Sequence, residues 1–152
     1  METPSFTFRL ERVRDLRTQA EDRAREELAN ELALRLRGAR LLEQAAEAAA
    51  DARATGRDAA RRATSGTELM AAQGWIERSR RRQQDAALDL DRRDAEVAAR
   101  RQALLHAARE RQSIDKLAER RRGEHDRMWA RRSQGELDEI ALVMHRRGSA
   151  VR

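Results

Sequence analysis

Apolar residues recur along this chain at steps of three and four, the spacing that places them on one face of an α-helix. In the first half the predicted stripe runs through Phe6, Leu10, Val13, Leu16, Ala20, Ala24, Leu28, Leu32, Leu36, Ala39, Leu42, Ala46, Ala49 and Ala52. Four-residue steps between Leu16 and Leu36 rotate this stripe around the helix axis. The pattern predicts a helix over about 4–62, with Thr3 as its N-cap and Pro4 in its first turn.

The second half has a stricter period of seven residues, which predicts a helix over about 66–146. Its first set of seam positions is Ile76, Gln83, Leu90, Val97, Leu104, Arg111, Ala118 and His125. The second set, three residues later, is Ser79, Ala86, Arg93, Arg100, Ala107, Ile114, Arg121 and Met128. The arginines among them can cover apolar surface with their stems while their charged heads reach water.

A short break separates the two helices. Ser65 and Glu68 have the spacing of a capping box, which predicts a turn at about 63–66 directly before the second helix. A short turn between long amphipathic helices folds them back against one another. We therefore predict an all-α fold, a long two-helix antiparallel coiled coil in which residue i faces roughly residue 128 − i. The whole chain, 1–152, would form one coiled-coil domain, and residues beyond about 128 would overhang.

The charge pattern is that of a folded helical protein with a basic bias. Charged residues make up 39% of the chain and aromatic residues 3%, so the core between the helices must be thin. Residues 1–66 carry 13 basic and 12 acidic side chains, and residues 67–152 carry 20 and 15, so the second half holds +5 of the net +6. Arg109, Arg120 and Arg131, eleven residues apart, could form a basic track for an acidic partner or could be an ordinary solvated face.

Catalytic or metal-binding chemistry finds no support in the sequence, and we expect no enzyme activity, cofactor or metal. The chain has no cysteine, and His106, His125 and His145 are too far apart for a metal-binding pair on one helix. The neighbours Glu124, His125 and Asp126 point in different directions on a helix. No apolar stretch approaches the ~18–20 residues that cross a bilayer, so we expect contact with a membrane only through partners.

Three segments resemble the flagellar FliJ family. Residues 8–17, FRLERVRDLR, resemble its N-terminal signature, and residues 75–78, WIER, resemble the step after its hairpin tip, where a tyrosine is commoner than Trp75. Residues 114–121, IDKLAERR, followed by Glu124 and then by QGELDEIA at 134–141, resemble its C-terminal ending. The segments lie in the family's order across most of the chain, although the middle, rich in alanine and arginine, matches nothing in particular.

The resemblance implies a non-enzymatic stalk in the flagellar protein export apparatus, at the cytoplasmic side of the inner membrane. Family members insert into the ring of the export ATPase, promote its assembly and link it to the cytoplasmic domain of the export gate, and some bind export chaperones. We assign the ring contact to the end of the hairpin that holds both termini, with Arg9, Arg12, Asp15, Arg131, Leu137, Asp138 and Ile140 as candidates. We assign the gate contact to Trp75 and Ile76.

Two other functions fit the residues alone. A basic coiled-coil scaffold could bind nucleic acid or an anionic membrane surface, although stacking aromatic residues are missing and we expect no nucleic acid. A homo-oligomeric scaffold could pair its seams between chains, whereas the favoured model is a monomeric hairpin. Trp75 and Trp129 could each serve local packing or contact a partner.

Overall fold

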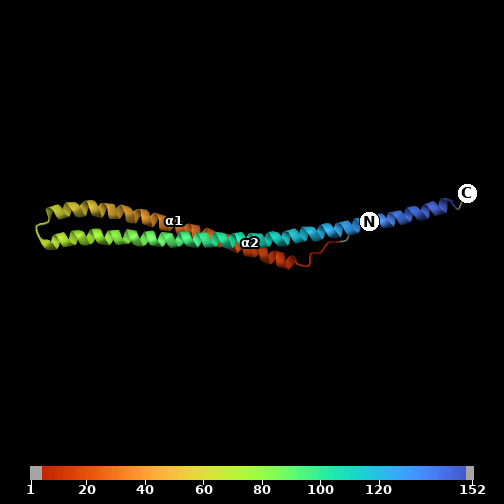
Figure 1. Ribbon diagram of the computed structural model, residues 1–152, viewed down its shortest axis with the longest axis horizontal. Helices are drawn as coiled ribbons and strands as arrows, with labels where there is room; N and C mark the ends of the chain where they lie inside the picture. Colours follow the sequence, from red (N-terminus) through yellow and green to blue (C-terminus); the bar gives the residue numbers. More distant parts are fainter. Residues whose placement is uncertain (1–4, 150–152) are drawn as a thin grey trace. The chain divides into compact units, whose positions relative to one another are not determined.

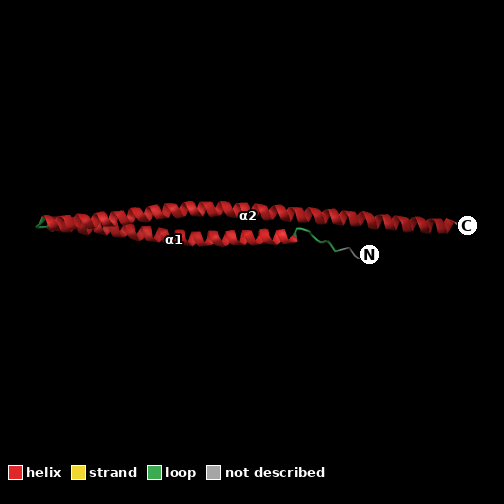
Figure 2. Cartoon of the chain, turned by 90° about the horizontal axis from the view of Figure 1, so that it is seen from below, coloured by secondary structure: helices red, strands yellow, loops and turns green. Residues whose placement is uncertain are grey.

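The fold is a helical hairpin, which confirms the predicted class. A computed structural model describes the backbone of residues 5–149 and the side chains of residues 5–146. Helix α1 spans Glu11–Arg62 and helix α2 spans Gly66–Ser149, packed against one another, and the described part contains no strand (Figures 1 and 2). The chain divides into two units, Met1–Glu21 with Ala107–Arg152 (unit 1) and Asp22–His106 (unit 2).

The first helix begins later than predicted. Residues 5–8 have no regular structure and 9–10 form a turn, in which the Glu11 N–H donates to the Phe8 carbonyl oxygen at 3.1 Å. Burial alternates along this segment: Phe6 and Phe8 are half-buried, while Thr7 between them is exposed. An extended chain puts every second side chain on one side, so both rings can face α2. The expected helix over 4–10 is therefore wrong for residues 5–10, and Thr3 and Pro4 lie outside the described residues.

The turn between the helices is closed by the predicted cap in a modified form. The Ser65 hydroxyl accepts from the Glu68 N–H at 3.3 Å, as expected of a capping box. The Glu68 carboxylate reaches one residue further back than predicted, to the Thr64 N–H at 2.8 Å. That hydrogen bond is the main cause of a lowered pKa for Glu68. At the other end, α2 continues to Ser149, three residues past its predicted end.

In unit 2 the second helix follows the predicted seam closely. Seam positions on α2 from Ile76 to Leu104 are buried or half-buried, with Ser79 and Val97 among the buried ones. On α1 the residues at 24, 28, 31, 38, 42, 45, 49, 52 and 56 are buried or half-buried, a spacing of three and four residues apart from one seven-residue step between 31 and 38. The register also agrees with the prediction, because the nearest side-chain atom to a Cβ built on Gly38 belongs to Leu90, at 3.7 Å.

The predicted apolar stripe of α1 is wrong in its middle. Leu32 and Leu36 are exposed, Leu36 to 52%. The residue of α1 that is half-buried after Leu28 is Glu31. Glu31 accepts a hydrogen bond from Arg93 of α2 at 3.2 Å, so a charged pair occupies the seam there. If the leucines at four-residue steps filled the seam, α1 would have to rotate against α2 along its length. The ion pair lets α1 keep the seven-residue register instead.

Unit 1 shows the same deviation. Leu10, Leu16 and Ala20, all in the predicted stripe, are exposed, whereas Val13 and Arg17 are half-buried and Glu21 is buried. Across from them, Ala107 of α2 is buried and Ile114 and Ala118 are half-buried. Small apolar residues thus alternate with charged ones in this seam, so the ion pairs decide which faces meet.

Candidate functional site

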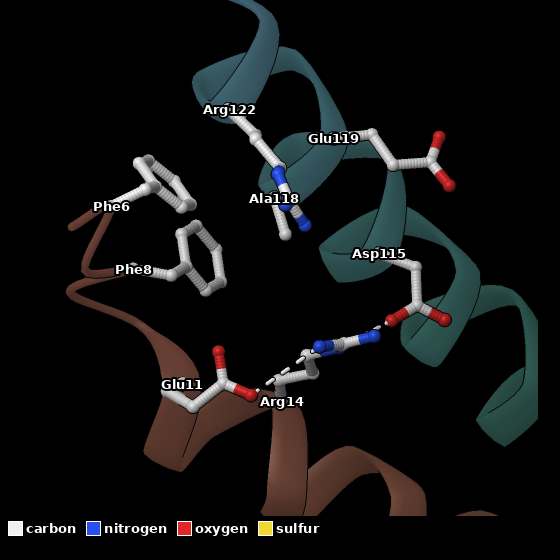
Figure 3. A pocket seen from close by; sticks show the side chains of 8 residues that line it. All are labelled: Phe6, Phe8, Glu11, Arg14, Asp115, Ala118, Glu119 and Arg122. Carbon is white, nitrogen blue, oxygen red and sulfur yellow. Dashed lines mark hydrogen bonds and ion pairs between the residues drawn. The ribbon is translucent and has the colours of Figure 1, made fainter. Parts of the chain in front are cut away.

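The most distinctive surface of unit 1 lies where the segment before α1 meets α2. Phe6 and Phe8 point from the loop toward Ala118 and Arg122, and together with Arg14 they border an open hollow of 340 Å³ (Figure 3). Glu11, Asp115 and Glu119 complete its lining. The hollow thus has aromatic residues from the first segment and charged residues from both, and the two segments lie about one hundred residues apart in the sequence.

Arg14 joins the start of α1 to α2. Its Nε donates to Asp115 Oδ1 at 2.7 Å and its Nη1 donates to Glu11 Oε1 at 3.3 Å. The hydrogen bond to Asp115, followed by the charge of that carboxylate, raises the pKa of Arg14 above its ordinary value. The guanidinium therefore positions the start of α1 on α2.

Further ion pairs continue along the seam of unit 1. Arg111 of α2 donates to Glu21 of α1 and also to Asp115, and Arg17 donates to Glu110. The hydrogen bond to Glu21 is the main cause of the raised pKa of Arg111. Asp115 thus accepts from both Arg14 and Arg111, and we call Arg14, Arg17, Glu21, Glu110, Arg111 and Asp115 the ionic belt. Its arginines are balanced by carboxylates, which reduces the basic surface that the net charge alone suggests.

Beyond the ionic belt, α2 continues without a second helix packed against it. The Phe6 ring meets the His125 ring with centroids 5.5 Å apart, and His125 Nδ1 lies 3.4 Å from Asp126 Oδ1. Of residues 126–146 only Trp129 and Ser133 are half-buried and all the others are exposed. Leu137 is 56% exposed and Met144 is 69% exposed. The predicted overhang is present, and it carries apolar groups without an intrachain partner helix.

The predicted ring-contact residues all lie in unit 1, in two groups. Arg9 is exposed in the turn before α1, next to a hollow lined also by Leu117 and Arg121, and Arg12 and Asp15 are exposed on α1. Arg131, Leu137, Asp138 and Ile140 are exposed on the overhang, where Asp138 accepts a hydrogen bond from Gln134 at 3.0 Å. The first group thus lies at the start of α1 and the second on the overhang of α2.

The predicted gate-contact residues lie in unit 2 and differ in solvent exposure. Trp75 is 46% exposed, whereas Ile76 is half-buried against α1. A Cβ built on Gly56 would lie only 2.7 Å from Ile76 Cδ1, so the isoleucine packs directly on the glycine backbone. Trp75 can therefore meet a partner, while the side chain of Ile76 serves the seam.

Sequence reasoning missed the role of several unit 1 residues. It placed Arg111 in the seam but did not predict that Glu21, Arg17 and Arg14 would meet α2. A signal was available, because Arg14 and Asp115, and likewise Arg17 and Glu110, are opposite charges at positions that satisfy the predicted register. The alternation of Phe6, Thr7 and Phe8 could similarly have indicated an extended segment.

The described residues contain neither a candidate metal-binding cluster nor a candidate membrane-spanning stretch. No group of three or more His, Asp or Glu side chains within the described ranges could hold a metal ion. Over the same residues, neither helix has a stretch apolar enough, over a sufficient length, to cross a membrane.

Comparison with known proteins gives one match that covers nearly the whole chain. The family model described as "Flagellar FliJ protein" matches residues 6–150. Comparisons with curated proteins and with solved structures gave no match. The match includes the aromatic segment before α1, the ionic belt, the turn and the overhang of α2. The chain therefore belongs to the flagellar FliJ protein family, whose members are components of the flagellar export apparatus.

Proposed function

We propose that this protein is a non-enzymatic stalk that binds the flagellar export ATPase, promotes assembly of the ATPase ring and links the ring to the cytoplasmic domain of the export gate. Export chaperones are further expected partners. In this role the protein works on the cytoplasmic side of the inner membrane and reaches the membrane through its partners. Family membership supports the setting, and the overhang of α2 is the observation that carries the proposed contact with the ring.

The overhang has the dimensions and the surface that a ring-binding element needs. A single α-helix with its side chains is about 10–12 Å across, narrow enough to enter the centre of a protein ring. The exposed Leu137 and Ile140 offer apolar contact, and Arg131 and Asp138 offer charges of both signs on the same helix. A helix exposed on all sides can contact several surrounding subunits at once.

Ring assembly follows from mass action. A ligand that contacts several subunits of the assembled ring binds the ring more tightly than it binds a separate subunit, and so shifts the equilibrium toward the ring. Since the ionic belt and the aromatic segment fix the start of α1 on α2, the overhang is attached to a defined support.

We propose that unit 2 contacts the gate through the exposed Trp75, because tryptophan is enriched among residues that dominate interface energies.

Charge exchange on the overhang tests the ring contact. We expect Arg131→Glu/Asp138→Arg to reduce stimulation of the export ATPase about tenfold, since two charged contacts become repulsive while the net charge is unchanged. The hydrolysis rate at limiting ATPase concentration gives the readout. The matched control is Arg78→Glu/Asp85→Arg, an exposed pair on α2 with the same seven-residue spacing. Normal stimulation by the overhang variant, or an equal loss in both variants, contradicts the proposed contact.

A further inference from the structure

Residues 53–82, on α1 and α2 to either side of the turn, hold most of the net charge of the chain. We call this segment, which lies entirely in unit 2, the basic tip. It carries 8 arginines and 3 acidic side chains, so it holds +5 of the net +6. The whole chain has 33 Lys and Arg against 27 Asp and Glu, which leaves 25 and 24 for all other residues together. Outside the basic tip the chain is therefore almost neutral.

Most arginines of the basic tip have no carboxylate partner. Among the described residues, Arg81 pairs with Glu77 at 3.2 Å and Arg61 pairs with Asp58 at 3.7 Å. Six further arginines are exposed and form no ion pair within the described part of the chain: Arg53, Arg57, Arg62, Arg78, Arg80 and Arg82. In the ionic belt, by contrast, the arginines donate to carboxylates across the seam. The charge of the basic tip is thus not balanced by its neighbours, and it attracts anionic partners.

The unpaired arginines lie on two sides of the hairpin. Arg53 of α1 and Arg80 of α2 line the same open groove of 650 Å³, so they share one side. Arg57 follows Arg53 after four residues and is turned only about 40° from it around the axis of α1. We call Arg53, Arg57 and Arg80 the groove face. Trp75 is five residues before Arg80 and is turned about 140° from it, so it lies on the other side of α2.

The groove face combines positive charge with apolar surface. The apolar residues that line the groove are Leu42, Ala49, Ile76 and Ala87. Leu69 is 40% exposed, and since it is eleven residues before Arg80 it is turned only about 20° from that arginine. Of the described residues that line the groove, only Glu77 carries a carboxylate, and it accepts a hydrogen bond from Arg81 at 3.2 Å. The groove face therefore has excess positive charge beside apolar groups.

We propose that the groove face binds the surface of a membrane that contains anionic phospholipids. Guanidinium groups form paired hydrogen bonds with phosphate oxygens, and clustered arginines near an anionic bilayer each add to the attraction. Since both helices border the groove, one planar surface can meet arginines of α1 and α2 at once. The exposed Leu69 can enter the boundary between headgroups and acyl chains. Nucleic acid fits less well, because the described residues that line the groove include no aromatic side chain on which bases could stack.

The lipid contact goes beyond the proposed function, in which the protein reaches the membrane through its partners. Trp75, the proposed gate contact, lies on the side of α2 away from the groove face, so the two contacts do not compete. A lipid contact at the basic tip would hold Trp75 close to a gate in the same membrane and raise its effective concentration there. Only this last step rests on the proposed function, since lipid binding needs neither the gate nor the ATPase.

Co-sedimentation of the full chain with vesicles tests the lipid contact. We expect binding to vesicles of phosphatidylcholine with phosphatidylglycerol and none to vesicles of phosphatidylcholine alone. Raising the salt from about 0.1 M to about 0.5 M should weaken the binding at least about tenfold. Arg53→Gln/Arg57→Gln/Arg80→Gln should weaken it about a hundredfold, since three arginines that face the anionic surface are lost.

The matched control is Arg62→Gln/Arg78→Gln/Arg82→Gln, which changes the net charge by the same amount. Arg82 is turned only about 20° from Trp75, and Arg62 about 140° from Arg57, so these arginines lie away from the groove face. A helix is about 10–12 Å across, which places them farther from the lipid than the Debye length of about 8 Å. The control should therefore bind within about threefold of the wild type.

Several outcomes would overturn the lipid contact. Wild-type protein that binds neither kind of vesicle, or binds both equally, contradicts it, and so does an equal loss in the two triple variants. Single-stranded RNA at the same concentration of phosphate groups should displace little protein from the vesicles, and complete displacement would assign the groove face to nucleic acid instead. Circular dichroism at 222 nm checks that the helices of each variant are intact. Since the vesicles contain no gate or ATPase, a negative result leaves the proposed function to its own assay.

Discussion

Arg111→Leu is expected to lower the Tm of the protein more than any other single substitution in the ionic belt. Glu21 is only 3% exposed, and the Arg111 guanidinium that faces it also donates to Asp115. Removing the Arg111 guanidinium removes a positive charge from beside the buried Glu21 carboxylate. A buried carboxylate destabilises the folded state to the extent that its charge is not compensated. Thermal unfolding followed by circular dichroism at 222 nm measures the effect.

A double variant separates the ion pair from general packing. Replacement of a buried ion pair by apolar residues of similar volume is often neutral or stabilising. Glu21→Leu/Arg111→Leu should therefore regain much of the Tm lost in the single variant. Arg81→Leu is the matched control, because Arg81 pairs with Glu77 on the open surface of α2, where a salt bridge contributes little. Equal effects of the Arg81 and Arg111 substitutions would rule out the role assigned to the belt.

Gly56→Ala should destabilise the hairpin by about 1–2 kcal/mol, although alanine is the better helix former. A Cβ at this position would lie 2.7 Å from Ile76 Cδ1 and 2.8 Å from Ile76 Cγ1, closer than atoms can pack. Ile76 is β-branched and has few rotamers in a helix, so it cannot move aside without losing its own seam contacts. Urea unfolding of the wild type and the variant gives the difference in free energy.

Two further variants test the cause. Gly38→Ala is the control, because its Cβ would make an ordinary 3.7 Å contact with Leu90, and it should stabilise the protein by about 1 kcal/mol. In an Ile76→Ala background the clash at Gly56 is absent, so Gly56→Ala should become stabilising there. If Gly56→Ala remained destabilising in that background, the explanation by close packing would be wrong.

The fold could be predicted from the sequence because its signals are local and repeated. The seven-residue period of α2, the cap at Ser65 and the absence of any proline after Pro4 all indicate one arrangement of two helices. The seam of α1 could not be predicted from apolar residues, because it is determined by contacts with α2. Glu31 and Glu21 occupy seam positions since arginines lie opposite them, and Leu36 is left exposed as a result.

The candidate site was predictable in outline only. The overhang follows from the unequal lengths of the two helices, and its exposed Leu137 and Ile140 were expected. The packing of Phe6 and Phe8 on α2 was missed, because the gain from placing two aromatic rings against another helix outweighs the local preference for helix over residues 5–10. Which protein surfaces the overhang meets depends on residues of other chains, so it stays a proposal.

The rate of ATP hydrolysis by the cognate flagellar export ATPase, measured with and without this protein, tests the central claim most directly. The ATPase is held at a concentration too low for ring formation, and the protein is added from substoichiometric to equimolar amounts. The stalk role predicts a clear rise in rate, lost in Arg131→Glu/Asp138→Arg and kept in Arg78→Glu/Asp85→Arg. An unchanged rate, with a folded hairpin and an ATPase that forms rings at higher concentration, would contradict it.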